Sequence, residues 1–364
     1  MKIVVTGLSG NIGTALLRRL ITRAAEFGDV AVIGVCRRPP SPDGPEPLYR
    51  RARWTSLDLA VPGARQRLAE TFAGADAVVH LAWLFQPSHD IGYLERACVG
   101  GTAAVLGACQ DAEVRQLVHL SSLGVYSPGP DGPDGARVDE SWPHDGVPTS
   151  VYSRHKAAAE HLLDVLPADR PPSITRLRPG LVMQGPAASA ILRYGLPSWI
   201  PSAVVRLLPL LPLDRRFVVQ TVHSDDVADA VLTAVRRRAT GAFNLAAEPP
   251  ITSTGLADAL HARPLHVPAR WLRASVALSW HAGIQPLDPG WIDLAFAVPL
   301  MDSGRARREL GWEPRTDART ALAELVAGMK SGRGTSSAPL RPRVVAAELR
   351  DLVSRGPISH RRLP

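Results

Sequence analysis

The amino-acid sequence predicts an α/β protein built on a doubly wound parallel sheet with a smaller C-terminal region. Two observations support this fold class. Apolar runs of strand length alternate with helical patterns between residues 3 and 178, an order typical of a parallel sheet covered by helices on both faces. A turn with glycines at positions 7, 10 and 13 joins the first apolar run to the first helical pattern. Together these features predict a Rossmann-type sheet.

The first element is a buried strand over residues 3–5, which the glycine turn joins to a helix over residues 14–26. Gly7 permits a tight turn, Gly10 lets a pyrophosphate approach the backbone, and Gly13 lets the helix pack closely on the strand. The helix N-terminus offers free N–H groups to phosphates. We interpret the turn as a dinucleotide cradle; a glycine-rich turn without a ligand is the alternative. The residues expected to contact the cofactor here are Thr6, Gly7, Ser9, Gly10, Asn11, Ile12 and Gly13.

The remaining elements follow in the same alternating order. Strands are predicted over residues 30–36, 54–59, 76–82, 115–121 and 173–178, and helices over residues 61–72, 90–111 and 150–166. The pattern changes after residue 178, because residues 180–215 are rich in proline and show little period. A strand over 218–222, a helix over 225–237, a strand over 241–246 and short helices within 251–330 are predicted after them.

This pattern divides the chain into three parts. We expect residues 1–180 to form the dinucleotide-binding domain, with its sheet completed by parts of 215–247, and residues 181–328 to form mainly the substrate-binding region. Residues 329–364 are expected to be a basic, flexible tail, in which 331–342 has the composition of a linker and 344–353 forms a short helix. Truncation after Gly328 is therefore expected to leave cofactor affinity nearly unchanged.

Composition and charge exclude several classes of protein. The net charge of +8 suggests a nucleic-acid partner, but residues 330–364 carry eight Lys or Arg against two acids, which leaves only +2 for the rest of the chain. Prolines interrupt the apolar segment 196–213, so that no membrane span is expected. Cys36, Cys98 and Cys109 lack metal-binding spacing and are interpreted as reduced thiols of a cytoplasmic protein, and no metal site is predicted.

The second predicted strand ends at Cys36-Arg37-Arg38, where a dinucleotide fold meets the adenosine ribose. An acid at this point favours the free 2′-hydroxyl of NAD, whereas guanidinium groups match a 2′-phosphate. Arg37 and Arg38 therefore favour NADP, with NAD as the alternative; an exposed basic loop is the bland interpretation. Asp58, which Leu59 follows at the end of the third strand, either meets the adenine or caps the helix over 61–72.

Tyr152 and Lys156 are the sharpest candidates for catalysis. Four residues apart on a predicted helix, they share one face, so that the ammonium is expected to stabilise a phenolate and lower the tyrosine pKa. Ser121 and Ser122 end the fifth strand, at the sheet edge where sites form, and a serine hydroxyl there can hold a substrate oxygen. A Tyr-x-x-x-Lys pair alone is common on ordinary helices, but its order after the glycine turn and the serine favours a catalytic role.

With these motifs the chain resembles the extended short-chain dehydrogenase/reductases, the NAD-dependent epimerase/dehydratase family. The resemblance covers residues 1 to about 328. The motifs that carry it are Thr6-Gly7-x-x-Gly10-x-x-Gly13, His80-Leu81-Ala82, Ser122, Tyr152-x-x-x-Lys156, Arg178-Pro179-Gly180, His223-Ser224-Asp225-Asp226-Val227-Ala228 and Arg305-Ala306-Arg307-Arg308-Glu309-Leu310-Gly311-Trp312.

The resemblance implies roles for single residues. It implies that Tyr152 is the acid/base, that Lys156 also holds the nicotinamide ribose, and that Ser122 positions the substrate oxygen. A further group of residues would line the cofactor: Leu81, Ala82, Ser121, Pro179, Gly180 and Leu181. Trp83, with the apolar residues after it, either faces the site or packs in the core. By analogy, a homodimer would form through the helices over 90–111 and 150–166.

The leading hypothesis is an oxidoreductase that transfers a hydride between NADP and a small-molecule secondary alcohol or carbonyl. The alternatives are a nucleotide-sugar 4-epimerase or dehydratase with retained NAD, and a regulator that binds the cofactor without turnover. Two departures from the family bear on this choice. Cys98 stands where many members have asparagine, and Ala187-Ala188-Ser189-Ala190 follows Gly185-Pro186, where sugar-nucleotide enzymes often have one. Leu123 and Gly124 stand where a dehydratase would need an additional acid, which ranks that reaction lowest.

Overall fold

The computed structural model describes residues 1–41, 43–85, 88–129, 136–167, 170–195, 209–285 and 287–343. Seven parallel strands form its central sheet, in the order β10-β6-β5-β4-β1-β2-β3. Their bounds are β1 Lys2–Thr6, β2 Ala31–Cys36, β3 Arg53–Ser56, β4 Ala77–His80, β5 Gln116–Leu120, β6 Ser173–Pro179 and β10 Gly241–Leu245. The predicted Rossmann-type sheet is confirmed. Its strand order reverses at β1, so that a crevice opens between the carboxyl ends of β1 and β4.

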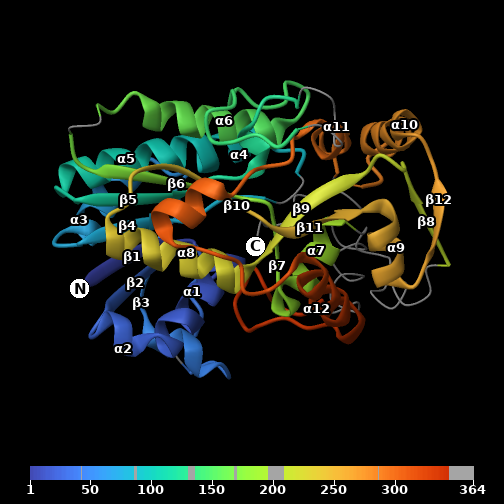
Figure 1. The fold of residues 1–364 in the computed structure, drawn as a ribbon. Coiled ribbons are helices and arrows are strands. Elements are labelled where there is room, and N and C mark those ends of the chain that lie inside the picture. The colour runs from blue at the N-terminus through green and yellow to red at the C-terminus, as the bar shows by residue number, and fades with distance from the viewer. Residues whose placement is uncertain are drawn as a thin grey trace.

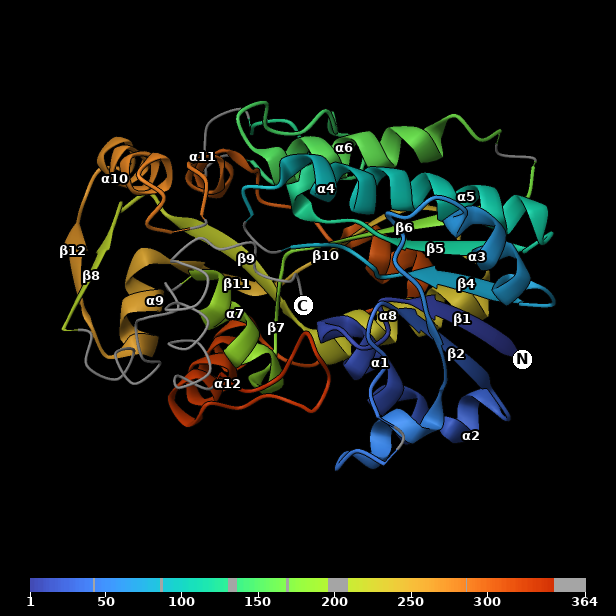
Figure 2. The ribbon, with the colours of Figure 1, turned by 180° about the vertical axis from the view of Figure 1, so that it is seen from behind.

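Helices cover both faces of this sheet (Figures 1 and 2). One face carries α1 (Asn11–Thr22), α2 (Ala24–Phe27) and α8 (Ser224–Arg237), and the other carries α3 (Ala64–Phe72), α5 (Gly101–Asp111) and α6 (Val151–Asp164). Each layer has its own apolar core, because the strands alternate their side chains between the two faces: Val5 packs with Leu16 and Leu17 of α1, and Val4 packs with Leu68 and Phe72 of α3.

Three predicted helices differ in detail from the observed ones, and the one expected over 61–72 begins only at Ala64. The first begins at Asn11 rather than residue 14, because Gly10 adopts extended backbone and ends the turn there. The helix expected over 90–111 consists of α4 (Ile91–Glu95), a π-helical turn (Arg96–Gly100) and α5. Asp90 caps α4 by accepting a hydrogen bond from the backbone N–H of Tyr93 at 2.9 Å. No helix within the described ranges is both long and apolar enough to cross a membrane.

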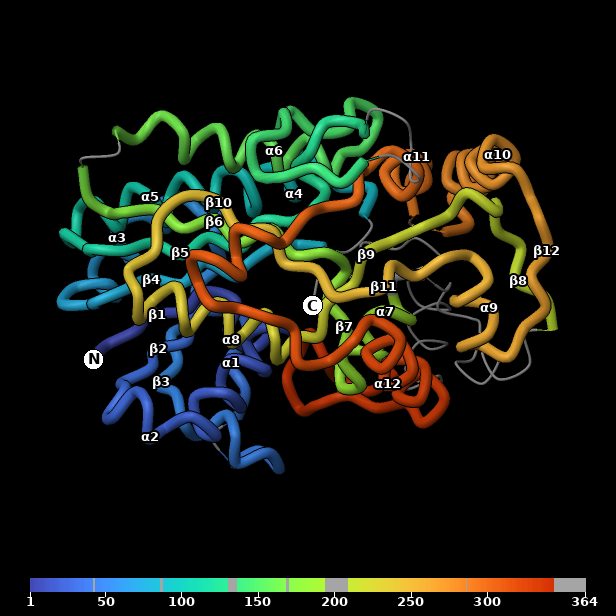
Figure 3. Tube along the Cα trace, in the orientation of Figure 1, coloured from blue at the N-terminus to red at the C-terminus, as the bar shows by residue number. Residues whose placement is uncertain are grey.

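The C-terminal region lies beside the carboxyl edge of the sheet, while α8 and β10 return to the sheet itself (Figure 3). Two small sheets belong to this region: β7 (Leu181–Met183), β9 (Val218–His223) and β11 (Ala247–Thr252) form one, and β8 (Leu210–Leu213) and β12 (Arg263–His266) form the other. Its helices are α7 (Ala188–Gly195), α9 (Ser253–Leu260), α10 (Ala269–His281), α11 (Gly290–Ala297) and α12 (Ala318–Ser331). Of the strands in these small sheets, only β9 was predicted.

A buried ion pair fixes α6 to the end of β6. The Arg178 guanidinium donates to both carboxylate oxygens of Glu160, at 2.9 and 2.5 Å, and to the Tyr126 hydroxyl at 3.0 Å. Arg178 is 3% exposed and Glu160 is fully buried. The pKa of Glu160 is lowered, because the bonds and charge of Arg178 outweigh the opposing effect of burial. Since α6 also carries Tyr152 and Lys156, this pair holds both candidates at the sheet edge.

We expect Arg178→Met to lower the free energy of unfolding by about 3–5 kcal/mol, because the Glu160 carboxylate loses its buried counter-charge. Urea denaturation followed by circular dichroism measures this loss. Arg65→Met is the matched control, because its pair with Asp111 is exposed to solvent and contributes little to stability. Equal losses in the two variants would contradict the structural role of the buried pair.

Candidate active site

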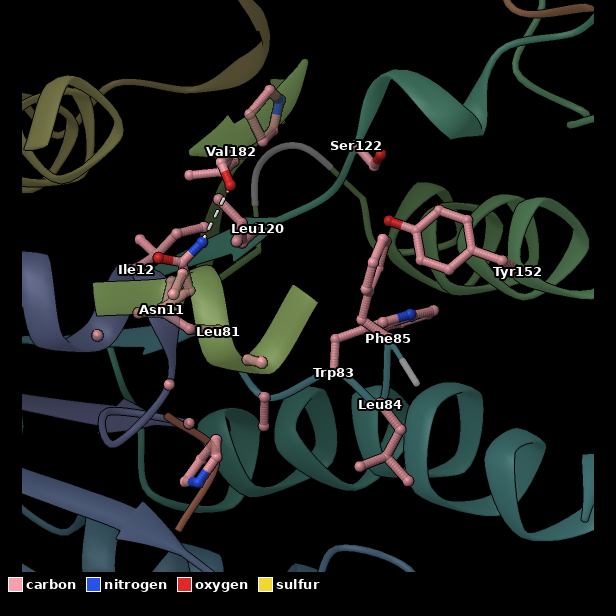
Figure 4. Close-up of a pocket in the computed structure, with 18 of the residues that line it drawn as sticks. Asn11, Ile12, Leu81, Trp83, Leu84, Phe85, Leu120, Ser122, Tyr152 and Val182 are labelled. Carbon is pink, nitrogen blue, oxygen red and sulfur yellow. Dashed lines mark hydrogen bonds between the residues drawn. The ribbon is translucent and has the colours of Figure 1, made fainter. Parts of the chain in front are cut away.

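A continuous cavity of about 610 Å³ lies at the carboxyl edge of the sheet. It extends from the glycine turn after β1, past the ends of β4, β5 and β6, to α11 in the C-terminal region. Figure 4 shows its middle, where Ser122 and Tyr152 face each other on one side and the glycine turn lies on the other. This is the crevice that an open α/β sheet forms where its strand order reverses.

The glycine turn fits a dinucleotide by its close backbone packing. Gly7 has φ +76°, and a Cβ there would lie 2.6 Å from the backbone nitrogen of Ala82. A Cβ at Gly13 would lie 2.3 Å from the carbonyl oxygen of Leu8. At Gly10, in contrast, an added Cβ would have one neighbour within 4 Å, the Gly7 carbonyl oxygen at 3.2 Å. The start of α1 lines the cavity at this point, so that its free N–H groups are available to phosphates.

All but one of the residues expected to contact the cofactor line this cavity. Thr6 is the exception, and its prediction as a direct contact is wrong. It is fully buried, and its Oγ1 lies 2.6 Å from Nδ1 of His80, because a side chain at the end of β1 points into the sheet layers rather than over the edge. The residues that do line the cavity are Gly7, Ser9, Gly10, Asn11, Ile12, Gly13, Arg37, Arg38, Asp58, Leu59, Leu81, Ala82, Trp83, Ser121, Pro179, Gly180 and Leu181.

At the adenosine end, a polar chain links two strands to α4. The Arg37 guanidinium donates to the Tyr93 hydroxyl at 2.9 Å, and this hydroxyl donates to Oδ2 of Asp58 at 2.8 Å. Oδ1 of Asp58 accepts from the backbone N–H of Ala60 at 2.9 Å, so the carboxylate caps the turn before α3 and not the helix itself, which begins at Ala64. Tyr93 was not predicted, because its helix lies far from both strands in the sequence.

Ser122 and Tyr152 form the reactive pair. Ser122 begins a short 3₁₀ helix (Leu123–Val125), and its Oγ accepts from the backbone N–H of Gly124 at 3.1 Å. Its hydroxyl faces the Tyr152 hydroxyl across the cavity (Figure 4). Burial raises the pKa of Tyr152, and the neighbouring Ser122 hydroxyl opposes that rise. The phenol is therefore protonated at neutral pH and stands ready as an acid.

The Lys156 ammonium does not make the expected interaction with the Tyr152 phenol. It shares a face of α6 with Tyr152, but its Nζ donates to the Leu120 carbonyl oxygen at 2.9 Å and lies 3.6 Å from the Trp83 ring centre. The expected lowering of the tyrosine pKa is absent, because these two groups hold the ammonium and burial acts on the phenol. Burial also lowers the pKa of Lys156 itself to about 7, against the weaker raising effects of Cys98 and Glu160. Cys98 accepts a hydrogen bond from the Leu84 N–H at 3.4 Å.

Three aromatic rings surround Tyr152. Its ring centre lies 6.3 Å from that of Trp83, 5.3 Å from that of Phe85 and 5.0 Å from that of Trp291. Trp83 therefore faces the site, as one of its two interpretations held. Phe85 belongs to the same run after β4, which was a usable signal. Trp291 lies on α11, about 140 residues after Tyr152, and no local pattern connects the two.

The prediction of a flexible linker over 331–342 is wrong. Residues 332–343, which we call the strap, bridge the two parts of the molecule: the Tyr49 hydroxyl donates to Thr335, and the Arg193 guanidinium donates to the carbonyl oxygens of Pro339 and Arg341. Leu340 is 2% exposed, because it packs against Ala187 and Ala190. Ala338, Pro339 and Leu340 line the cavity. The helix predicted over 344–353 lies outside the described residues.

Comparisons with known proteins show which proteins this chain is similar to. The model of the NAD dependent epimerase/dehydratase family matches residues 3–246. The chain is 27% identical to a 4-hydroxy-2-methyl-3-oxo-4-farnesyl-3,4-dihydroquinoline-1-oxide ketoreductase of Stigmatella aurantiaca, over 92% of this chain and 98% of the relative. It is 26% identical to a UDP-glucose 4-epimerase of Streptomyces lividans, over 86% and 91% of the two chains.

Solved structures show the same fold. The chain is similar to the UDP-glucose-4-epimerase of Stenotrophomonas maltophila with bound NAD, with a TM-score of 0.66 at 23% identity, over 91% of this chain and 98% of the other. It is similar to DesIV, a dTDP-glucose 4,6-dehydratase of Streptomyces venezuelae, with a TM-score of 0.66 at 22% identity, over 94% and 100%.

We expect truncation after Gly332 to weaken NADPH binding about tenfold or more, because three residues of the cavity wall are lost. This reverses the expectation for the tail. Fluorescence titration with NADPH measures the change. Truncation after Arg343 keeps the strap and is the matched control, which should bind NADPH like the full chain. Equal affinities for both truncated proteins would show that the strap is not part of the cofactor site.

Proposed function

Because this chain belongs to the NAD dependent epimerase/dehydratase family of oxidoreductases, we propose that it is an NADPH-dependent reductase of a ketone, or in reverse a dehydrogenase of the secondary alcohol. The observation that carries the proposal is the position of Tyr152. Its hydroxyl faces Ser122 in the cavity, where the cofactor-binding edge of the sheet meets the C-terminal wall (Figure 4). A substrate oxygen placed there meets both hydroxyls.

The residues of the chain divide the work of this reaction. The nicotinamide of a bound NADPH supplies the hydride that attacks the carbonyl carbon. Ser122 donates a hydrogen bond to the carbonyl oxygen and holds it against Tyr152. Tyr152 gives its phenolic proton to that oxygen as the carbonyl becomes an alcohol, and water restores the proton afterwards. Lys156, beside the ring of Trp83, would hold the nicotinamide ribose.

The preference for NADP rests on the adenosine end of the cavity. Arg37 and Arg38 line it directly after β2, and among the described lining residues the only acid is Asp58. That carboxylate is occupied by the Ala60 N–H and the Tyr93 hydroxyl. A 2′-phosphate therefore meets two guanidinium groups, whereas the acid that could accept from the 2′-hydroxyl of NAD already carries two hydrogen bonds.

A second candidate function is a nucleotide-sugar 4-epimerase that retains NAD. The 26% identity to the Streptomyces lividans epimerase favours it. Such an enzyme oxidises and re-reduces its substrate, so that it consumes no NADPH. The proposal of net reduction is supported by the ketoreductase relative and by the pair of arginines. The homodimer and the cytoplasmic location stay predictions.

We expect Tyr152→Phe to lower kcat for NADPH-dependent reduction about 10²- to 10⁴-fold, because the proton donor is removed while the ring keeps its packing against Trp291. Steady-state NADPH oxidation measures the effect, and an unchanged melting temperature shows that the fold is intact. Turnover within a few-fold of the parent protein would remove Tyr152 from the mechanism.

We expect Arg38→Ser to lower the ratio of kcat/KM for NADPH over NADH about 10- to 100-fold, because a charge-assisted contact to the 2′-phosphate is lost. Arg53→Ser is the control, since Arg53 is exposed on β3 and does not line the cavity. A parent protein that prefers NADH would contradict the assignment, whatever the variants do.

A further inference from the structure

The cavity has two halves of different chemistry. The charged side chains among its described lining residues are Arg37, Arg38, Asp58 and Lys156, and all of them come from the sheet edge and α6. The C-terminal region, in contrast, contributes sixteen described lining residues between Leu181 and Leu340, and every one of them is apolar. Leu181 and the strap residues Ala338, Pro339 and Leu340 are assigned to the cofactor side, which leaves twelve apolar residues for the other half. Whatever fills this half meets hydrocarbon and aromatic surface.

The polar groups of the catalytic centre lie at one end of the apolar half. Tyr152 packs between Phe85 and Trp291, whose rings also contact each other at 4.9 Å. Beyond these rings the wall continues through Phe217, which directly precedes β9, through Val219 of β9 and through α11. A ligand here has its one polar group at Ser122 and Tyr152, and the rest of its body lies against apolar side chains.

The basic residue of α7, Arg193, does not line the apolar half of the cavity. Arg193 donates to the carbonyl oxygens of Pro339 and Arg341 in the strap and is absent from the cavity lining. A nucleoside diphosphate in this half would therefore place its charges against apolar side chains, where a buried charge without a partner is costly. The described wall does not offer the charged contacts that bind diphosphates elsewhere.

We propose that the substrate is an uncharged ketone, or the matching secondary alcohol, whose body is a bulky hydrocarbon or aromatic group. This inference rests on the proposed reductase and names its substrate class. The carbonyl oxygen lies between Ser122 and Tyr152. The apolar body extends from there past Trp291 into the C-terminal half, and its removal from water supplies most of the binding free energy.

Isothermal titration of the NADP⁺-loaded protein with the methyl ketones from 2-hexanone to 2-dodecanone tests this class, because an oxidised cofactor allows binding without turnover. We expect the dissociation constant to fall about fourfold for each added methylene until the cavity is filled. UDP-glucose should bind more weakly than 2-dodecanone. A flat series, or tighter binding of UDP-glucose, overturns the inference. Steep binding without any NADPH-dependent reduction of the same ketones would contradict the proposed reductase and leave the substrate class standing.

Two variants distinguish the effect of a polar cavity wall from a general effect of a leucine-to-glutamine substitution on the protein. Leu287 lines the apolar half, whereas Leu278 is 74% exposed on α10 and lies outside the cavity. Leu287→Gln should weaken 2-dodecanone binding about tenfold, because the amide makes the wall polar. Leu278→Gln should leave the series unchanged. Equal behaviour of the two variants would overturn the assignment of this half to an apolar substrate.

Discussion

The buried ammonium of Lys156 is the constraint on which the site depends. It is 2% exposed, and the Leu120 carbonyl and the Trp83 ring are its immediate contacts. Burial lowers its pKa from 10.5 to about 7, so that the folded state binds fewer protons than the unfolded state between these values. Stability therefore rises with pH across this interval, and the cost of the buried charge is fully present below pH 7. The Arg178–Glu160 pair holds α6, and with it Lys156, in place.

The same scaffold carries two chemistries. One half is built from strand ends and the glycine turn, and it presents backbone groups and the side chains of Arg37 and Arg38. The other half comes from the C-terminal region, which contributes apolar walls alone among its described lining residues. A solved structure that shares this fold holds a UDP-sugar. One fold can host many functions, so the substrate has to be argued from the side chains that line the site.

The sequence predicted what local patterns encode. The glycine turn, the strand-end serines and the Tyr/Lys spacing lie within single turns or helices, so that their place at the sheet edge follows from the fold class. Tyr93, Trp291 and the strap come from segments that meet the site only through tertiary packing. The strap has the composition of a linker, yet the burial of Leu340 and the bonds of Arg193 order it. The prediction that Thr6 contacts the cofactor was wrong for a simpler reason, because its side chain is buried between the sheet layers.

The fate of the hydride tests the account most directly. NADPH deuterated at nicotinamide C4 is incubated with the protein and an apolar methyl ketone, and the alcohol is analysed by mass spectrometry. One deuterium in each alcohol molecule, with one NADPH oxidised for each, is the result that the account predicts. Conversion of UDP-glucose to its 4-epimer on tightly bound NAD, without label transfer or net oxidation of NADPH, would contradict it.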